Sequence, residues 1–372
     1  MKQIEITAND AGRRLDRFLR KYLPKASLSS IYKIIRKDVK VDGRRRGEEY
    51  ILAEGEILSL YLSDDMISEL RGDTDFEFAD GNSGDNHGNH DNRNNQNNVN
   101  NRNARNGGNK KARRNFKIIY EDENILAVDK PFGLLTHGDG IEKKNHLANQ
   151  VKDYLIERGD FNPRTEKVFA PAPANRLDRN TTGIVICGKT SPALKGLNEM
   201  IRKDLVRKFY VTIVHGRIDR EMRLGGYLVK DHNTNKVEIR KTSPEGSGSV
   251  SKTSLEGRSG GRPEASPEGK EVVTIVRPIK VLSDGRNEYT YIEVELVTGR
   301  THQIRAHLAS ISHPLIGDVK YGGKKVFGLS TQLLHAVRLE FSGSVEGLEY
   351  LENMTLEAPL PEDFDKILEA LN

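Results

Sequence analysis

The chain of 372 residues has only one cysteine, Cys187, and no hydrophobic run long enough to cross a bilayer. A single cysteine excludes an internal disulfide framework and is typical of a reducing compartment. A membrane span needs roughly 18 apolar residues in a row, and no stretch approaches that length. The first residues also lack the long apolar core of a signal peptide. We therefore expect a cytoplasmic protein that does not enter a membrane.

The sequence also lacks the patterns of common metal and phosphate sites. Neither H-E-x-x-H nor G-x-x-x-x-G-K-[ST] occurs. His87 and His90 could ligate a metal, but no further ligands converge on them. These absences argue against a metal site and against a phosphate-binding loop of this type.

Positive charge is concentrated at the N-terminal end. Residues 1–62 contain 14 Lys and Arg against 9 Asp and Glu, and this excess of five positive charges equals the net charge of +5 of the whole chain. A localised basic segment is typical of nucleic-acid binding, although an ordinary solvated surface is the alternative.

Within this segment, apolar spacing predicts a helix over 13–23, a second helix that Ser27, Ser29 or Ser30 can cap, and a strand over 57–62. The pattern, which includes the turn Asp42-Gly43, resembles the small alpha-L RNA-binding module of the S-four type. The resemblance covers roughly residues 13–62, and an ordinary amphipathic helix pair is the alternative. RNA-binding candidates are basic residues off the apolar faces: Arg14, Arg17, Lys33, Arg36 and Lys37.

Composition then divides the remainder of the chain. Residues 63–115 begin acidic, and residues 82–109 contain 13 asparagines, so we expect a disordered linker over 63–115. Residues 116–372 show many short strands and few helices, which predicts an α+β domain with a mainly antiparallel mixed sheet. A Gly/Ser/Glu/Pro-rich stretch at about 243–269 is expected to be a mobile insertion.

The most informative stretch is Asn175-Arg176-Leu177-Asp178-Arg179-Asn180-Thr181-Thr182-Gly183, followed by an apolar run. A carboxylate between two guanidinium groups stays ionised at neutral pH, and an ionised carboxylate can act as a nucleophile. Taken by itself, this loop favours a simpler interpretation, in which Asp178 only forms a local turn with Asn180. Three further segments accompany this loop: 208–216, 296–308 and 313–322.

The ordered combination of these four segments strongly resembles the RluA-type RNA pseudouridine synthases, especially the RluC/RluD-like ribosomal RNA enzymes. The resemblance covers about residues 116–372. It implies an isomerase that needs no cofactor, cleaves the uridine glycosidic bond, turns the uracil and rejoins it through carbon-5. The family usually has His where Asn175 stands, which we expect to affect loop support and not the chemistry.

The resemblance also implies residue roles. Asp178 would be the nucleophile, Tyr210 would stack on the flipped base and help to position or accept the carbon-5 proton, and Arg305 would pair with Asp178. Arg176 would fill the space that the flipped base leaves. On an ideal helix from Thr301, His302 shares a face with Arg305, so His302 is a further RNA-contact candidate.

Simpler interpretations remain for single residues: Tyr210 could be a core residue and Arg305 a surface ion pair. For the whole chain we predict a monomeric enzyme that converts specific uridines of ribosomal RNA to pseudouridine. We expect the RNA to be that of the large subunit, either as free RNA or within a pre-ribosomal particle. The alternatives are a non-catalytic RNA-binding or ribosome-assembly factor and a transfer-RNA pseudouridine synthase.

Overall fold

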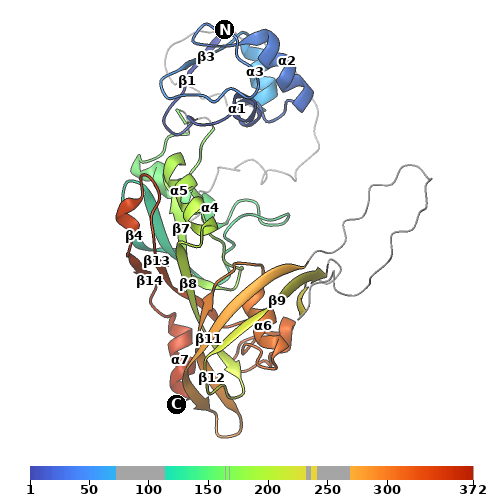
Figure 1. Cartoon of the computed structure of the whole chain (residues 1–372), viewed down its shortest axis with the longest axis vertical. Helices are drawn as coiled ribbons and strands as arrows, with labels where there is room; N and C mark the ends of the chain where they lie inside the picture. The colour runs from blue at the N-terminus through green and yellow to red at the C-terminus, as the bar shows by residue number, and fades with distance from the viewer. Residues whose placement is uncertain (73–113, 164, 167, 232–235, 241–268, 372) are drawn as a thin grey trace, which may run out of the picture. The chain divides into compact units, whose positions relative to one another are not determined.

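The computed structural model describes residues 1–72, 114–163, 165–166, 168–231, 236–240 and 269–371 (Figure 1). The chain divides into two compact units. One comprises Met1–Ala112 with Pro163–Phe169, and the other comprises Arg113–Asn162 with Ala170–Asn372. The expected insertion at 243–269 and most of the expected linker lie outside the described residues.

The N-terminal unit is a small helix-and-sheet module. Its elements are β1 (Lys2–Glu5), α1 (Leu15–Tyr22), α2 (Leu28–Asp38), β2 (Val39–Val41), β3 (Ile57–Leu60) and α3 (Asp64–Arg71). The strands form an antiparallel sheet in the order β1-β3-β2. The apolar faces that the sequence predicts are buried, for example Leu15, Phe18 and Ile31. Of the candidate caps, Ser27 is the residue whose hydroxyl accepts the backbone N–H of Ser30.

Helix α3 corrects the predicted start of the linker. Residues 64–71 were expected to be disordered, yet they form a helix with Ser63 as N-cap and Gly72 in a left-handed conformation at its end. Ile67 is buried in the core of this unit. Acidic composition at 64–80 concealed a short amphipathic segment with a serine cap and a glycine stop.

The second unit is built on one long sheet. Its strands are β4 (Lys117–Glu121), β5 (Ile125–Lys130), β6 (Ala172–Pro173), β7 (Thr182–Gly188), β8 (Val206–His215), β9 (Met222–Asp231), β10 (Lys236–Arg240), β11 (Lys270–Ser283), β12 (Glu288–Leu296), β13 (Leu334–Phe341) and β14 (Thr355–Glu357). The order is β10-β9-β11-β12-β8-β13-β7-β5-β4, with β6 on β7 and β14 on β13. Among the described strand pairs, only β13 with β7 is parallel.

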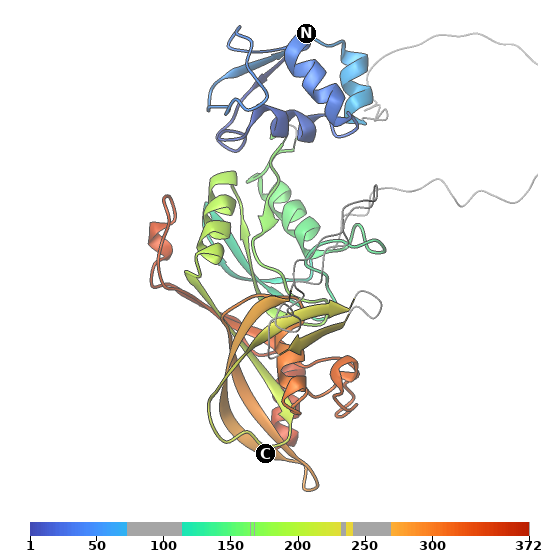
Figure 2. The same cartoon turned by 45° about the vertical axis from the view of Figure 1, so that its right-hand side comes forward.

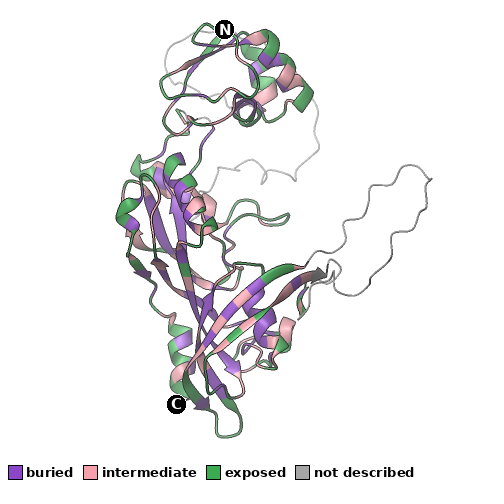
Figure 3. Ribbon diagram, in the orientation of Figure 1, coloured by how far each residue is buried: buried purple, intermediate pink, exposed green. Residues whose placement is uncertain are grey.

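Helices cover separate parts of this sheet. They are α4 (Leu147–Arg158), α5 (Ser191–Arg202), α6 (Gln303–Ser310), α7 (Glu362–Ala370) and the 3-10 turns η2 (Val319–Tyr321) and η3 (Glu349–Leu351). Helix α5 packs on the β5–β7 side, α7 on β8, β11 and β12, and α6 on β9 to β11 (Figures 1 and 2). Central strands are buried along most of their length (Figure 3). The predicted α+β class with a mainly antiparallel mixed sheet is confirmed.

No helix among the described residues is long and apolar enough to span a membrane. Cys187 is fully buried on β7, where burial raises the pKa of its thiol. A buried thiol of raised pKa behaves as a small hydrophobic side chain.

Candidate active site

The loop that carries Asp178 is fastened to strand β7 by Asn175. The side-chain amide of Asn175 donates to the carbonyl of Ile184 (3.2 Å) and accepts from the backbone N–H of Ile186 (2.9 Å). This side chain therefore continues the hydrogen-bond ladder by which β6 pairs with β7. Asn175 thus supports the loop, and it also lines the cavity that Asp178 faces.

Further contacts fix the backbone on both sides of Asp178. The buried hydroxyl of Thr136 donates to the carbonyl of Leu177 (2.9 Å) and accepts its N–H (3.1 Å). The carbonyl of Asp178 accepts the N–H of Thr181 (3.0 Å), which closes a turn. A reactive side chain on a loop needs such support, because small displacements cost catalytic rate.

Lys130, at the end of β5, links the turn that follows this strand to the loop that carries Asp178. Its side chain is fully buried, and its ammonium donates to the carbonyls of Pro131 (3.1 Å), Leu134 (2.8 Å) and Arg179 (3.1 Å). Burial lowers the pKa of Lys130 to about 7, whereas the nearby Asp178 carboxylate opposes that shift. No local sequence pattern predicts this contact between Lys130 and the residue after Asp178.

Tyr210 comes from the middle of the sheet. It lies on β8, between Val294 of β12 and Ala336 of β13, and is 7% exposed. Burial first, and the Asp178 carboxylate second, raise the pKa of its phenol. Tyr210 is therefore a neutral phenol at neutral pH, held on a rigid support.

Arg305 and His302 reach Asp178 from the start of α6. Arg305 Nη1 and His302 Nε2 each lie 3.8 Å from Oδ2 of Asp178. Both side chains therefore point at one site, as expected. The helix that they were expected to share begins only at Gln303, and His302 precedes it with φ +56° in the left-handed region. His302 is delivered by an unusual backbone conformation and not by helical periodicity.

The main partner of Arg305 is Asp318, which sequence analysis did not single out. Arg305 Nε and Nη2 donate to the two carboxylate oxygens of Asp318, both at 2.7 Å. The side chains of Arg305 and Asp318 are 7% and 1% exposed, so the pair is buried. The ring of Tyr321 lies 4.8 Å from the guanidinium carbon. The predicted Arg305–Asp178 contact is present, but it is the longer of two carboxylate contacts.

These residues enclose one cavity of about 370 Å³ in the second unit. Its lining includes the five candidates Asp178, Tyr210, Arg305, Arg176 and His302. Arg176 is exposed and Asp178 is partly exposed, so an RNA nucleotide can reach both. A cavity of this size with convergent polar groups and an aromatic wall can hold a single extruded base.

The family described as RNA pseudouridylate synthase matches residues 124–310, which include the Asp178 loop, Tyr210 and Arg305. The chain belongs to the RNA pseudouridine synthases. Curated relatives place it in the RluA-type branch related to RluC and RluD. An uncharacterized RNA pseudouridine synthase of Bacillus subtilis, YlyB, is 31% identical over 68% of this chain and 72% of its own length.

Two further relatives have named targets. Ribosomal large subunit pseudouridine synthase D of Vibrio vulnificus is 30% identical over 68% of this chain and 70% of its own. Ribosomal large subunit pseudouridine synthase C of Pasteurella multocida is 27% identical over 100% of this chain and 94% of its own. The solved structure of human RNA pseudouridylate synthase domain containing 4 shares the fold, with a TM-score of 0.50 and 22% identity over 68% of this chain and 92% of that one. The predicted isomerase class is thereby confirmed.

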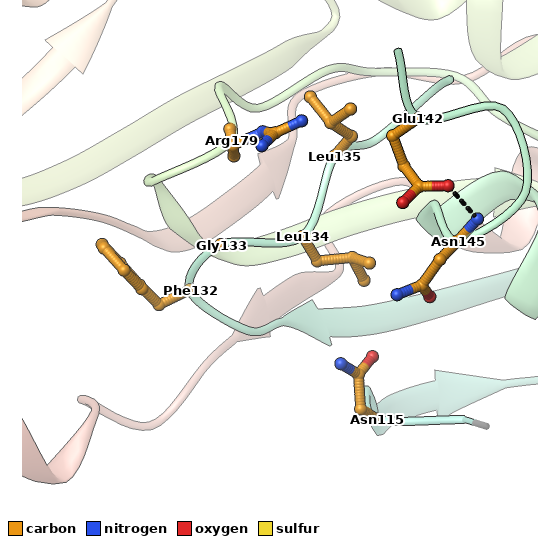
Figure 4. Close-up of a pocket in the computed structure, with 8 residues that line it drawn as sticks. All are labelled: Asn115, Phe132, Gly133, Leu134, Leu135, Glu142, Asn145 and Arg179. Atoms are coloured by element: carbon orange, nitrogen blue, oxygen red, sulfur yellow. Dashed lines mark hydrogen bonds between the residues drawn. The ribbon is translucent and has the colours of Figure 1, made fainter. Parts of the chain in front are cut away.

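A smaller cavity of about 150 Å³ in this synthase is lined in part by Arg179, the residue after Asp178 (Figure 4). Phe132, which is 59% exposed, and Arg179 are part of its wall. Glu142 accepts the backbone N–H of Asn145 at 2.7 Å beside it. Because Lys130 binds the Arg179 carbonyl, Lys130 supports both this cavity and the loop that carries Asp178.

The basic candidates of the N-terminal unit differ in their environment. Arg17, Lys33, Arg36 and Lys37 are exposed, and no ion pair among the described residues involves them. Arg14 is half-buried and paired with Asp16 (3.1 Å) and Glu49 (3.0 Å). The exposed residues are available to phosphates, whereas Arg14 is already engaged in an intramolecular contact.

Metal ligands are not assembled in the described part of the chain, since no group of three or more His, Cys, Asp or Glu side chains gathers there. His87 and His90 lie outside the described residues. Two further histidines are engaged in hydrogen bonds within the protein: His307 with the hydroxyl of Thr274 (2.8 Å) and His313 with the carbonyl of His215 (2.8 Å).

Proposed function

We propose that this synthase converts specific uridines of large-subunit ribosomal RNA to pseudouridine, with Asp178 as the nucleophile. The observation that carries the catalytic part is the single cavity in which Asp178, Tyr210 and Arg305 meet. The target class is supported by the printed names of relatives that act on the ribosomal large subunit. The net reaction breaks the C1′–N1 bond, forms a C1′–C5 bond and transfers the carbon-5 proton to solvent or N1.

Entry of the substrate requires that the uridine leave its base stack. Extrusion costs a few kcal/mol, and stacking on an aromatic side chain returns about 1–3 kcal/mol per base. Tyr210 can provide this stacking, because its ring lines the cavity from a rigid strand. Since its phenol is neutral, we assign Tyr210 to positioning the base and not to proton abstraction as a phenolate. Arg176, exposed at the same cavity, is suited to occupy the vacated stack.

Asp178 must remain an accessible carboxylate. Its side chain is 32% exposed, and the buried Arg305 guanidinium stands 3.8 Å away. Arg305 therefore supplies positive charge to the carboxylate without capturing it in a close ion pair.

We assign RNA capture to the N-terminal unit. Its exposed Arg17, Lys33, Arg36 and Lys37 would bind phosphates and make affinity dependent on salt. The proposal implies that wild-type protein adds pseudouridine to large-subunit RNA and not to small-subunit or transfer RNA. All three RNAs would be purified from cells that lack the gene, incubated with the enzyme and sequenced after chemical marking of pseudouridine.

The matched control is Asp178→Asn, which keeps the shape of the side chain. Marks that appear only in transfer RNA would overturn the ribosomal assignment and leave the enzyme class intact. If Asp178→Asn introduced the same pseudouridines into large-subunit RNA as the wild type, the assignment of Asp178 as the nucleophile would be overturned.

A further inference from the structure

The imidazole of His302 lies beside the reactive carboxylate without a role in the steps described above. Its Nε2 atom is 3.8 Å from Oδ2 of Asp178, the same oxygen that Arg305 faces. His302 precedes α6 with φ +56°, and its side chain does not cap the helix. A non-glycine residue in this region is strained, and such strain is concentrated at functional sites. The position of His302 therefore needs an explanation.

The other nitrogen of this ring contacts Tyr321. His302 Nδ1 and the Tyr321 hydroxyl oxygen are 3.0 Å apart, and the same oxygen accepts the backbone N–H of Val237 at 3.0 Å. A phenol has one hydrogen to donate. Among the described residues, the hydrogen-bond partner left for that hydrogen is Nδ1 of His302. The hydroxyl therefore donates to Nδ1.

This direction determines which ring nitrogen carries the proton. A neutral imidazole that accepts at Nδ1 bears its hydrogen on Nε2. Nε2 faces Asp178, and an ionised carboxylate only accepts. The donors thus run in one direction: Val237 N–H to Tyr321, Tyr321 O–H to His302, and His302 Nε2–H toward Asp178.

A charged imidazolium fits this arrangement poorly. It would need an acceptor at Nδ1, and the Tyr321 hydroxyl hydrogen would then have no acceptor among the described residues. Burial lowers the pKa of His302, the charges of Arg305 and Lys320 lower it further, and Asp178 and Asp318 oppose this. The pKa of Tyr321 is raised, mainly by burial, so its hydroxyl keeps its proton. Geometry and charge agree on a neutral ring.

We propose that Tyr321 and His302 are positioning residues: Tyr321 holds His302 as the Nε2–H tautomer, which donates to Asp178 and directs the other carboxylate oxygen to the substrate. Both Arg305 and His302 approach Oδ2, so Oδ1 is the oxygen left to attack. We expect the contact of 3.8 Å to shorten when substrate binds, as is common for catalytic hydrogen bonds. This assignment deepens the proposed function and rests on it for the identity of the substrate.

The tautomer can be measured directly. The full-length protein, labelled with 15N at its ten histidines, would be observed by NMR at pH 7.5, and the signal missing from His302→Gln identifies His302. We expect a neutral ring with the hydrogen on Nε2. In Tyr321→Phe, which keeps the ring over Arg305, we expect this signature to change. Tyr120→Phe is the matched control, because it removes a phenol hydroxyl bound to Asp122 (3.0 Å) outside the catalytic cavity.

Activity supplies the second readout. We expect Tyr321→Phe to lower kcat about tenfold with KM within about twofold, as is usual for a lost supporting hydrogen bond. His302→Ala should lose more, and His302→Gln, which restores an N–H donor near Nε2, should recover part of that loss. Glutamine and alanine meet the same left-handed backbone at this position, so the difference in kcat between the two variants reports the effect of the N–H donor.

A protonated ring, or a hydrogen on Nδ1, in the wild type at pH 7.5 would overturn the proposal. So would an unchanged kcat in Tyr321→Phe, or equal kcat in His302→Gln and His302→Ala. Failure of the proposed function gives a different result, because the wild-type enzyme would then leave large-subunit RNA unmodified while the NMR signature still reports the hydrogen-bond chain.

Discussion

Removing the Asp318 carboxylate should release Arg305, which also faces Asp178, from its main hydrogen-bond partner. In Asp318→Ala the buried Arg305 guanidinium loses two hydrogen bonds of 2.7 Å and keeps its charge. Breaking a buried ion pair from one side costs about 3–5 kcal/mol, because the remaining charge is uncompensated. The backbone N–H of Tyr321 loses its contact with the Asp318 carboxylate (3.3 Å) but keeps its hydrogen bond to the Asp318 main-chain carbonyl (3.0 Å). At about 2–4 °C per kcal/mol, we expect Tm to fall by roughly 6–20 °C.

Activity should fall as well. With Asp318 gone, Asp178 becomes the nearest carboxylate to Arg305 and would be drawn into a close pair. A nucleophile held in a close ion pair is less reactive, so kcat should drop by about tenfold or more even at a temperature where the variant is folded. Asp318→Asn retains one acceptor oxygen and the shape of the side chain, and should lose about half as much stability.

The assay is urea unfolding followed by circular dichroism, combined with single-turnover kinetics at 20 °C. Glu199→Ala, which breaks the exposed pair with Lys203 (2.7 Å), is the control and should cost about 0.3–0.5 kcal/mol. If Asp318→Ala were within about 1 kcal/mol of wild type, the estimate for a buried pair would be refuted. If it were destabilised but fully active, the link between Asp318 and catalysis would be refuted.

Three further predictions concern the support of the loop. Lys130→Met leaves three carbonyls without their donor and should lower the free energy of unfolding by about 2–4 kcal/mol, measured with urea. Because the pKa of Lys130 is lowered to about 7, the difference in free energy of unfolding between wild type and variant should be constant below pH 7 and grow between pH 7 and 10. A difference that stays constant over the whole range would contradict this. Gly183→Ala should unfold the β7–β13 seam, because Gly183 has φ +104° and a Cβ would collide with the Ala336 carbonyl; a soluble variant with wild-type Tm would refute this. Thr181→Val should leave stability unchanged or raise it by about 1 kcal/mol, since the buried Thr181 hydroxyl has no partner in the described structure; a clear loss of Tm would contradict this.

Local patterns predicted the elements that frame the site. The many short strands predicted the mainly antiparallel sheet, and the ordered motifs indicated residues that the structure places in one cavity: Asp178, Tyr210 and Arg305. These features depend on residues close together in sequence or on a family pattern. The helix α4 was missed because its apolar stripe is narrow, with Leu147, Val151 and Leu155 among polar neighbours.

Long-range partners could not be predicted in this way. The reach of Lys130 to the Arg179 carbonyl spans 49 positions, and no periodicity records it. Asp318 lay inside a recognised motif, yet its pairing with Arg305 depends on how η2 packs beside α6. The conformation of His302 was mispredicted because a helix was extended by two residues, and one left-handed residue redirects a side chain completely.

Tritium release from RNA labelled at uridine carbon-5 tests the central claim most directly. Wild-type enzyme, Asp178→Asn and Asp178→Ala would be compared under single-turnover conditions on large-subunit ribosomal RNA. We predict release by the wild type and a loss of at least about a thousandfold in both variants, as expected for a covalent nucleophile. Release by either variant at a rate near that of the wild type would contradict the assignment of Asp178.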